Sequence, residues 1–351
     1  MKKRIIIMAG GTGGHVFPAL AVAKEFINQG WDVSWIGTKK GLESRVVPEN
    51  NIEIDWLSVN GLRGKGFLAL LKMPWMLLVA CCEARAILKR RQPDVVLGMG
   101  GFVAGPAGLL AKWLGIPLVI HEQNRIPGTT NCLLSKLATT VLEAFPQSFS
   151  ADKQAQFTGN PLRAEFIQRP IEVLREATDT GVHVLILGGS LGAQRLNEVL
   201  PEALSCMDAL EVHHQTGTKM QAIVEQQYKE KQIKATVTAF IDDMVAAYRW
   251  ADVVICRAGA MTVSELMAAG LPSILVPYPY AIDDHQTANA QYLVEAGAGI
   301  MIPQSMLNEG VVAEKMHMLL KNKVEMGKAA KQLAQLQATQ KVVSFCQQVA
   351  K

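Results

Sequence analysis

The amino-acid sequence predicts an α/β protein in which strands and helices alternate to build parallel β-sheets. Short β-branched runs alternate with stretches of helical character along the chain, which is the pattern of strand–helix–strand units. Glycine-rich turns follow several of these runs, and a pattern from the first half recurs in the second. At 351 residues the chain is long for one hydrophobic core, since single cores stop growing near ~250–300 residues. We therefore expect two similar domains.

The apolar runs define the predicted strands. In the first half they are Arg4–Met8, Asp32–Ile36, Asp94–Leu97 and Leu118–His121, and in the second His183–Leu187, Glu211–His214, Thr236–Ala239, Asp252–Cys256 and Ser273–Val276. The stretch Ala19–Ile27 has helical character, and the tail from about Gly310 to Lys351 is predicted to form helices.

Two patterns occur in the same order in both halves of the chain. Ile5–Gly11, an apolar strand followed by two glycines, matches Val184–Ser190. Asp94–Val96 followed by Gly115–Pro117 matches Asp252–Val254 followed by Gly270–Pro272. This repetition predicts two Rossmann-like halves. The linker is predicted near Gly159-Asn160-Pro161, because the residue before a proline disfavours helix and an Asn-Pro pair favours a turn.

Composition excludes several classes of protein. Hydrophobic residues make up 49% and charged residues 19%, which argues against disorder, and a net charge of +4 is too small to indicate nucleic-acid binding. The six cysteines lack Cys-x-x-Cys and any paired metal spacing, which predicts buried thiols in a reducing compartment.

Apolar runs in this chain are too short for targeting or membrane-spanning segments. The run after Lys2-Lys3-Arg4 is too short for a signal peptide and enters a glycine turn. The best candidate for a membrane span, Met73–Cys82, has ten residues, well short of the ~18–20 that a span needs. We expect a protein that is soluble or lies on a membrane without crossing it.

Three glycine-rich turns follow predicted strands: Gly10–Gly14, Gly98–Gly101 and Gly188–Gly192. Such turns can be ordinary connectors, but three of them at the carboxyl ends of strands favour phosphate binding by backbone amides and helix N-termini. A dinucleotide is disfavoured, because a third glycine is missing at Val16 and the second strand ends in Gly37-Thr38-Lys39 rather than in an acidic residue. No glycine run carries the Gly-Lys-Ser/Thr of a nucleoside-triphosphate loop.

Eight short motifs occur along the chain: Gly10–His15, Gly61–Gly66, Gly98–Gly101, His121–Asn124, Gly159–Arg163, Gly188–Ser190, Phe240–Met244 and Thr262–Glu265. Together they resemble the MurG family of UDP-N-acetylglucosamine transferases, within glycosyltransferase family 28. The resemblance runs from residue 4 to about 300, and the last fifty residues match only in helical character.

The resemblance implies the GT-B architecture, with two Rossmann-like domains of parallel sheet facing across a cleft. Residues 1–161 would form an acceptor- and membrane-binding domain, and residues 162–334 would bind UDP-N-acetylglucosamine. A C-terminal helix at about 335–351 would pack back on the first domain. The family is peripheral on the cytoplasmic face of the bacterial inner membrane, and other cell-wall synthesis proteins are candidate partners.

The resemblance also implies a reaction in peptidoglycan biosynthesis. N-acetylglucosamine would pass, with inversion, from UDP-N-acetylglucosamine to the 4-hydroxyl of undecaprenyl-diphosphate-N-acetylmuramoyl-pentapeptide, which converts lipid I to lipid II. No Asp-x-Asp occurs in the chain, so we expect no metal and no cofactor, with the departing UDP stabilised by amides, helix dipoles and Arg163. The alternatives are a UDP-N-acetylglucosamine 2-epimerase, which needs no lipid acceptor, and an inactive sugar-nucleotide-binding scaffold.

Site residues follow from the resemblance, motif by motif. Glu265 would accept hydrogen bonds from both ribose hydroxyls of the donor. Alternatively, Thr262-x-x-Glu265 is a capping box that satisfies a helix N-terminus. The donor set is Thr12, Gly13, Gly14, Asn124, Arg163, Ser190, Ile241, Ala260, Met261, Thr262, Val263, Ser264, Glu265 and Gln286, with Asn289 supporting Gln286; Gly10, Gly11, Gly100 and Gly101 would bind the acceptor diphosphate.

His15 is the candidate catalytic base, because a histidine that titrates near neutrality suits removal of the acceptor hydroxyl proton. Equally, His15 could hydrogen-bond an acceptor phosphate without taking a proton. Glu122 and His121 are the competing bases, and the residues alone do not decide among them.

The segment Phe67–Arg91 combines apolar side chains with lysine and arginine, a combination that suits an anionic bilayer surface. The pattern also fits a core helix with a solvated basic end. The residues predicted to contact the membrane are Phe67, Leu71, Lys72, Trp75, Met76 and Val79.

Overall fold

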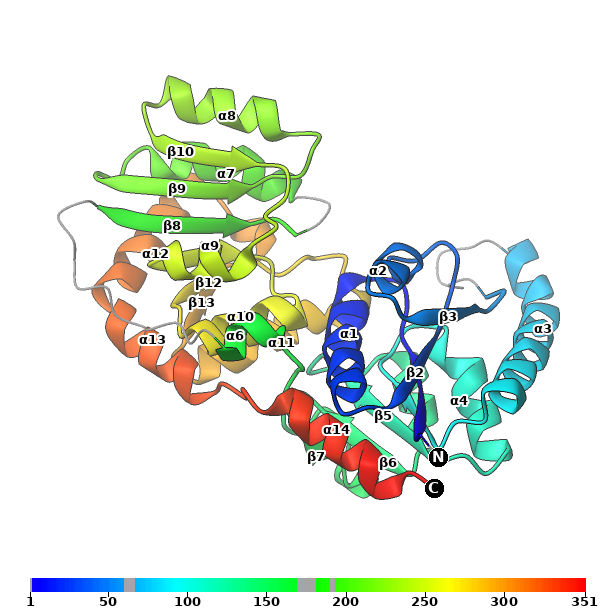
Figure 1. The fold of residues 1–351 in the computed structure, drawn as a ribbon. Helices are drawn as coiled ribbons and strands as arrows, with labels where there is room; N and C mark the ends of the chain where they lie inside the picture. Colours follow the sequence, from blue (N-terminus) through cyan, green and yellow to red (C-terminus); the bar gives the residue numbers. More distant parts are fainter. Residues whose placement is uncertain (1, 60–66, 169–180, 190–192) are drawn as a thin grey trace. The chain divides into compact units, whose positions relative to one another are not determined.

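The computed structural model describes residues 2–59, 67–168, 181–189 and 193–351 (Figure 1). The chain forms two compact units, one of Met1–Arg163 with Leu336–Lys351 and one of Ala164–Gln335. The sequence placed the division two residues earlier, beside the Asn160-Pro161 turn.

The first unit is built on a parallel sheet in the order β3-β2-β1-β4-β5-β6-β7. The strands are β1 (Arg4–Met8), β2 (Asp32–Gly37), β3 (Glu53–Trp56), β4 (Val95–Gly98), β5 (Leu118–Glu122), β6 (Thr140–Glu143) and β7 (Gln156–Phe157). The helices are α1 (Gly13–Asn28), α2 (Glu43–Glu49), α3 (Phe67–Arg91), α4 (Ala104–Trp113), α5 (Thr129–Leu134) and α14 (Ala338–Val349), with a short 3₁₀ turn at Ala151–Lys153.

Alternating side chains of β1 supply the two cores of this unit. Ile5 and Ile7 pack on one face with α1 and with Val342 of α14, whereas Ile6 and Met8 pack on the other face with α3 and α4. Successive strand residues point to opposite faces of a sheet, so a continuous apolar run indicates a strand covered on both sides. The last helix therefore completes the core of the first unit.

The second unit repeats this plan on a parallel sheet in the order β10-β9-β8-β11-β12-β13. The strands are β8 (Val182–Leu187), β9 (Leu210–Gln215), β10 (Lys234–Thr238), β11 (Val253–Cys256), β12 (Ser273–Leu275) and β13 (Gly299–Met301). The helices are α6 (Ala164–Gln168), α7 (Gln194–Leu204), α8 (Gln221–Glu230), α9 (Met244–Trp250), α10 (Ala260–Ala269), α11 (His285–Glu295), α12 (Glu309–Lys321) and α13 (Lys323–Gln332), with 3₁₀ turns at Ile282–Asp284 and Gln304–Met306.

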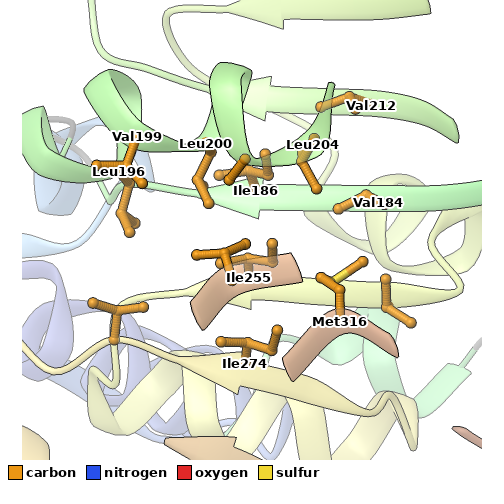
Figure 2. Packing of buried hydrophobic residues seen from close by; sticks show 14 of the residues in the cluster. Val184, Ile186, Leu196, Val199, Leu200, Leu204, Val212, Ile255, Ile274 and Met316 are labelled. Carbon is orange, nitrogen blue, oxygen red and sulfur yellow. The ribbon is translucent and has the colours of Figure 1, made fainter. Parts of the chain in front are cut away.

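Figure 2 shows the core of the second unit, where the apolar face of α7 lies on the sheet. Leu196, Leu200 and Leu204 recur at helical spacing and pack with Ile186 of β8 and Met316 of α12. Complete burial of side chains of this size contributes about 1.5–3 kcal/mol each. The α7 stripe thus fixes that helix on the face of β8.

The internal repetition extends to side-chain chemistry. Asp94 accepts a hydrogen bond from the Arg4 amide at 2.7 Å and donates its own amide to the Arg4 carbonyl at 2.8 Å. Asp252 forms the same pair with His183, at 2.9 Å in both directions. Each aspartate therefore joins the starts of corresponding strands, which confirms the prediction of two similar Rossmann-like halves.

All nine predicted strands are present, with ends displaced by at most two residues. Four strands escaped prediction: β3, β7 and β13 at sheet edges and β6 beside an edge. They have two to four residues, too few to establish an alternating pattern. The expectation of buried cysteines was wrong for half of them, since Cys82, Cys132 and Cys206 are exposed.

Candidate functional site

In each sheet the strand order reverses between two neighbours, β1 and β4 in the first unit and β8 and β11 in the second. Ligands of open α/β sheets bind at the carboxyl ends of the strands at this reversal. The predicted glycine turns Gly10–Gly14 and Gly98–Gly101 follow β1 and β4, so they lie side by side. A Cβ atom on Gly101 would lie 2.6 Å from the Gly10 carbonyl oxygen, which shows that the backbones touch.

We expect Gly101→Ala to destabilise the first unit more than Gly11→Ala. Both glycines have positive φ, +79° and +93°, and the left-handed conformation alone costs another residue about 1–2 kcal/mol. A Cβ on Gly11 meets nothing within 4 Å, whereas one on Gly101 meets a backbone carbonyl that cannot rotate away. Urea-unfolding free energies of the two variants measure the difference, and equal losses would contradict this packing.

Glu43 braces the first glycine turn, a role that sequence reasoning missed. Its fully buried carboxylate accepts hydrogen bonds from the Gly11 amide at 2.9 Å and from the Thr38 amide and hydroxyl at 2.9 and 2.8 Å. Cβ atoms on Gly10, Gly37 or Gly41 would clash with this side chain, and that glycine spacing is the signal that could have revealed it. The Gly11 amide is therefore engaged within the protein.

The start of α1 carries the predicted residues Thr12, Gly13, Gly14 and His15. Thr12 is exposed and forms the N-cap without a side-chain hydrogen bond. The first amides of a helix lack intrahelical acceptors, so those of Gly13 and Gly14 suit an anion.

His15 is half-buried and joined to β5 through Gln123. His15 Nδ1 lies 2.8 Å from Gln123 Oε1, and a Cβ on Gly100 would lie 2.7 Å from the same nitrogen. Gly100 therefore makes room for the imidazole.

The competing base His121 lies in the interior. Its Nε2 is 3.0 Å from the Gly159 carbonyl oxygen and its Nδ1 is 3.0 Å from Gln123 Nε2. Complete burial lowers the pKa of His121 to about 4. A neutral, enclosed imidazole of such low basicity does not suit proton abstraction near neutral pH.

We predict that neutral His121 makes folding sensitive to acid. The unfolded chain takes up this proton near pH 6.5, but the folded protein does so only near pH 4, so stability is lost as pH falls through this window. The loss attributable to His121 between pH 7 and 5 is on the order of 2 kcal/mol. Urea unfolding at both pH values checks this, because His121→Asn should flatten the pH dependence. An unchanged slope would contradict the assignment.

The other competing base, Glu122, is buried and organises the loop after β5. Its carboxylate accepts hydrogen bonds from the Asn124 amide (3.0 Å) and side chain (3.2 Å), the Gly128 amide (3.1 Å) and the Asn131 side chain (2.8 Å). These donors occupy both oxygens, so the structure favours a positioning role for Glu122. Half-buried Asn124 is held in this loop.

In the second unit, α10 starts at Ala260 with Gly259 as its N-cap. Thr262 and Glu265 therefore lie inside the helix, and the capping-box interpretation is wrong. Glu265 is 7% exposed and accepts a hydrogen bond from the Tyr248 hydroxyl at 3.0 Å. Its carboxylate thus stands one turn beyond the helix N-terminus at the sheet reversal.

Five of the remaining predicted donor residues, Ala260 to Ser264, belong to this helix. Val263 and Ile241 are buried, Met261 and Thr262 are half-buried, and Ser264 Oγ donates to the Ala260 carbonyl at 2.9 Å. Gln286 Oε1 accepts from the Tyr278 amide at 2.9 Å, and Asn289 Nδ2 donates to the Ala258 carbonyl at 3.2 Å. Ser190 and the Gly61–Gly66 motif lie outside the described residues. Arg163, which ends the first unit, has its guanidinium carbon 5.0 Å from the centre of the Phe17 ring.

Arg257, at the end of β11, is a second residue that sequence reasoning missed. Its guanidinium donates to the carbonyls of Val276 and Pro277 and to Gln304 Oε1. Burial lowers the pKa of Arg257. It therefore joins the turns after β11 and β12. Within the described parts of the chain, no three His, Cys, Asp or Glu side chains gather as a metal site requires.

Helix α3 has features of both predictions made for it, a core helix and an exposed apolar surface. Ala80, Ala84 and Leu88 are buried in the core, whereas Trp75 is 71% exposed and Leu78 also faces solvent. Met76 and Val79 are half-buried, and the predicted contacts Phe67, Leu71 and Lys72 belong to the helix but their side chains lie outside the described set. In the portions that the structure describes, no helix has the length and apolarity to cross a membrane.

Two features of this surface differ from the sequence expectation. Arg90 and Arg91 form ion pairs with Asp55, and Arg91 also pairs with Glu53, so acidic residues of β3 neutralise part of the basic charge at the end of the helix. Trp113 of α4, which sequence reasoning missed, is 72% exposed and lies 5.7 Å from the Arg85 guanidinium carbon. Exposed apolar side chains therefore occur on both α3 and α4.

The chain matches the glycosyltransferase family 28 N-terminal domain over residues 5–143 and the C-terminal domain of the same family over residues 183–348. Relatives named UDP-N-acetylglucosamine–N-acetylmuramyl-(pentapeptide) pyrophosphoryl-undecaprenol N-acetylglucosamine transferase include one from Methylococcus capsulatus, 56% identical over 99% of this chain and 98% of the relative. Another, from Shewanella frigidimarina, is 49% identical over 98% and 96%.

Solved structures agree with these matches. The crystal structure of MurG from Acinetobacter baumannii is 42% identical, with a TM-score of 0.87 over 99% of each chain. The glycotransferase of kitacinnamycin matches over 100% of each chain with a TM-score of 0.76, but at 15% identity this shows the fold alone. Two Rossmann-like units of parallel sheet are the GT-B arrangement, and the chain belongs to glycosyltransferase family 28.

Proposed function

We propose that this chain transfers N-acetylglucosamine from UDP-N-acetylglucosamine to the 4-hydroxyl of undecaprenyl-diphosphate-N-acetylmuramoyl-pentapeptide, converting lipid I to lipid II. The observation that carries the proposal is 56% identity over 99% of the chain to a relative named for this transfer. The second unit would hold the UDP-sugar through α10 and Glu265. The first unit would bind the acceptor at the turns after β1 and β4.

Transfer would be an inverting displacement at the anomeric carbon. His15 would take the proton of the acceptor hydroxyl as its oxygen attacks, the new oxygen–carbon bond would form, and the bond to UDP would break. Amides at the start of α10 and in the turn after β8, together with Arg163, would stabilise the charge on UDP without a metal ion. Because the Gly11 amide is bound to Glu43, the acceptor diphosphate would instead contact the amides of Gly13 and Gly14, which the resemblance had assigned to the donor.

The test is UDP release from UDP-N-acetylglucosamine with and without lipid-linked muramoyl-pentapeptide. We expect release only when the acceptor is present. Loss of UDP-N-acetylglucosamine without acceptor, with a 2-epimer as product, would instead support the epimerase. Binding of UDP without release under any condition would support the scaffold.

We also propose that the exposed apolar surface of α3 and α4 binds the cytoplasmic face of the anionic inner membrane, where a polyprenyl acceptor resides. Exposed Trp75 and Trp113 support this, because indole rings favour the membrane interface.

We therefore expect co-sedimentation with anionic vesicles at low salt, reduced several-fold by Trp75→Ala combined with Lys72→Glu. The matched control is Ile223→Ala, which removes an exposed apolar side chain of α8 in the second unit. Equal binding by the wild type and the double variant would exclude this surface. Loss of binding at high salt in the wild type would confirm the electrostatic part of the attraction.

A further inference from the structure

A continuous chain of hydrogen-bonding groups connects His15 to the backbone of Gly159. His15 Nδ1 is 2.8 Å from Gln123 Oε1, Gln123 Nε2 is 3.0 Å from His121 Nδ1, and His121 Nε2 is 3.0 Å from the Gly159 carbonyl oxygen. Gln123 and His121 are buried and His15 is half-buried. These links join the first turn of α1 to the end of β5 and to the segment after β7.

Two backbone carbonyls fix the direction of every bond in this chain. Gln123 Nε2 lies 3.0 Å from the His121 carbonyl oxygen, which can only accept, so this atom is the amide nitrogen. The Gly159 carbonyl likewise requires a proton on His121 Nε2. Burial keeps His121 neutral, so its single proton is on Nε2 and its Nδ1 accepts from Gln123.

The orientation of the Gln123 amide determines which nitrogen of His15 carries a proton. Because the nitrogen of the Gln123 amide faces His121, its oxygen faces His15 Nδ1, and an oxygen without hydrogen can only accept. His15 Nδ1 must therefore carry a proton. In neutral His15 the lone pair is then on Nε2, the nitrogen on the far side of the ring from Gln123.

We propose that Gln123 and His121 are positioning residues that hold His15 in the Nδ1–H tautomer, so that Nε2 is the atom that accepts the acceptor proton. The inference rests on the proposed function for its catalytic meaning. A partner that fixes the tautomer of a catalytic histidine is a known requirement of base catalysis. Here a neutral amide supplies it, which orients the imidazole without adding a negative charge beside an anionic acceptor.

Neighbouring residues hold this chain of hydrogen bonds, the relay His15–Gln123–His121–Gly159, in place. Asn160 Nδ2 donates to the Gln123 carbonyl at 3.0 Å, and Asn131 Nδ2 donates to the His121 carbonyl at 3.1 Å. Gly100 leaves the space that His15 Nδ1 occupies. The motifs His121–Asn124 and Gly159–Arg163 are thus connected by hydrogen bonds. Gln123 and Gly159, which had no predicted role, are the residues that make this connection.

The direct test is the imidazole ¹⁵N spectrum of histidine-labelled wild-type protein, with the His15 signals assigned by their loss in His15→Ala. We expect a protonated Nδ1 and an unprotonated Nε2 in neutral His15. The opposite tautomer, or a mixture of both, would overturn the proposal. This readout needs no substrate, so it remains valid even if the proposed transfer fails.

Kinetics provide the second test, with Gln123→Met, which keeps a similar shape but removes all three side-chain hydrogen bonds of Gln123. We expect kcat to fall about 10- to 100-fold while KM for UDP-N-acetylglucosamine stays within about twofold. Gln123→Glu should move the acid limb of the pH–rate profile to higher pH, because a carboxylate stabilises the imidazolium.

The matched control is Thr158→Val, since the buried Thr158 hydroxyl donates to the same Gly159 carbonyl at 3.0 Å but lies outside the relay. It should leave the pH profile unchanged. Wild-type kcat in a folded Gln123→Met variant, with transfer intact in the wild type, would refute the relay and leave the proposed function standing. No transfer by the wild type would refute the function instead.

Discussion

Replacing Glu265 with alanine should raise KM for UDP-N-acetylglucosamine by about 10- to 100-fold while changing kcat little. Hydrogen bonds to a charged group are worth about 1.5–3 kcal/mol, and the ribose hydroxyls are not at the reacting centre. Loss of such contacts weakens ground and transition states alike, which appears in KM. Steady-state kinetics with varied donor, together with calorimetric binding of UDP, measure the effect.

A structural role for Glu265 predicts a different result. The carboxylate accepts the Tyr248 hydroxyl hydrogen bond at 3.0 Å, so its loss also leaves a buried hydroxyl without this acceptor. Tyr248→Phe removes the same bond from the other side and serves as the matched control. If both variants lose stability equally and both keep wild-type KM, Glu265 supports α10 and does not bind the donor. A raised KM in Glu265→Ala alone supports ribose binding.

The sequence predicted the fold because its central strands are apolar on both faces. Ile5 and Ile7 pack into one core and Ile6 into the other. Such a continuous apolar run can be recognised in the sequence without knowing which strands pair with it. The strands it missed are short and lie at or near sheet edges, where pairing with a neighbour, rather than their own pattern, defines them.

The candidate site was predictable only where a local motif carries it. The glycine turns were found because glycine at a strand end has a backbone reason to be there. The role of Gln123 escaped although the motif His121–Asn124 contains this residue, because its partner His15 lies 108 residues away in the sequence. Glu43 escaped for the same reason, since its partners come from two different turns.

The capping-box error has a related cause. Thr262-x-x-Glu265 satisfies a local rule, but the position of the helix start depends on where β11 ends. That strand ends at Cys256, and Gly259 takes the N-cap with extended backbone. The helix therefore begins two residues before Thr262, so Thr262 is not the N-cap and Glu265 is not at the N3 position that the rule requires.

Replacing His15 with alanine should lower kcat by about 100- to 10,000-fold, the usual contribution of a positioned general base. KM for UDP-N-acetylglucosamine should change little, because the donor is proposed to bind through the second unit. The fall in rate at low pH that a general base gives the wild type should be absent from the pH–rate profile of His15→Ala, because this variant has no such base. Quenched assays of lipid II formation across pH measure both quantities.

His15→Asn separates proton abstraction from simple hydrogen bonding, the two roles that the sequence left open. Asparagine can still donate a hydrogen bond to a phosphate, but it cannot accept a proton near neutral pH. If His15 is the base, His15→Asn and His15→Ala should be equally slow. If His15 only binds the acceptor diphosphate, the asparagine variant should recover most of kcat and KM for the lipid acceptor. His15 would then act as an imidazolium whose Nε2–H donates to the phosphate, rather than as the base.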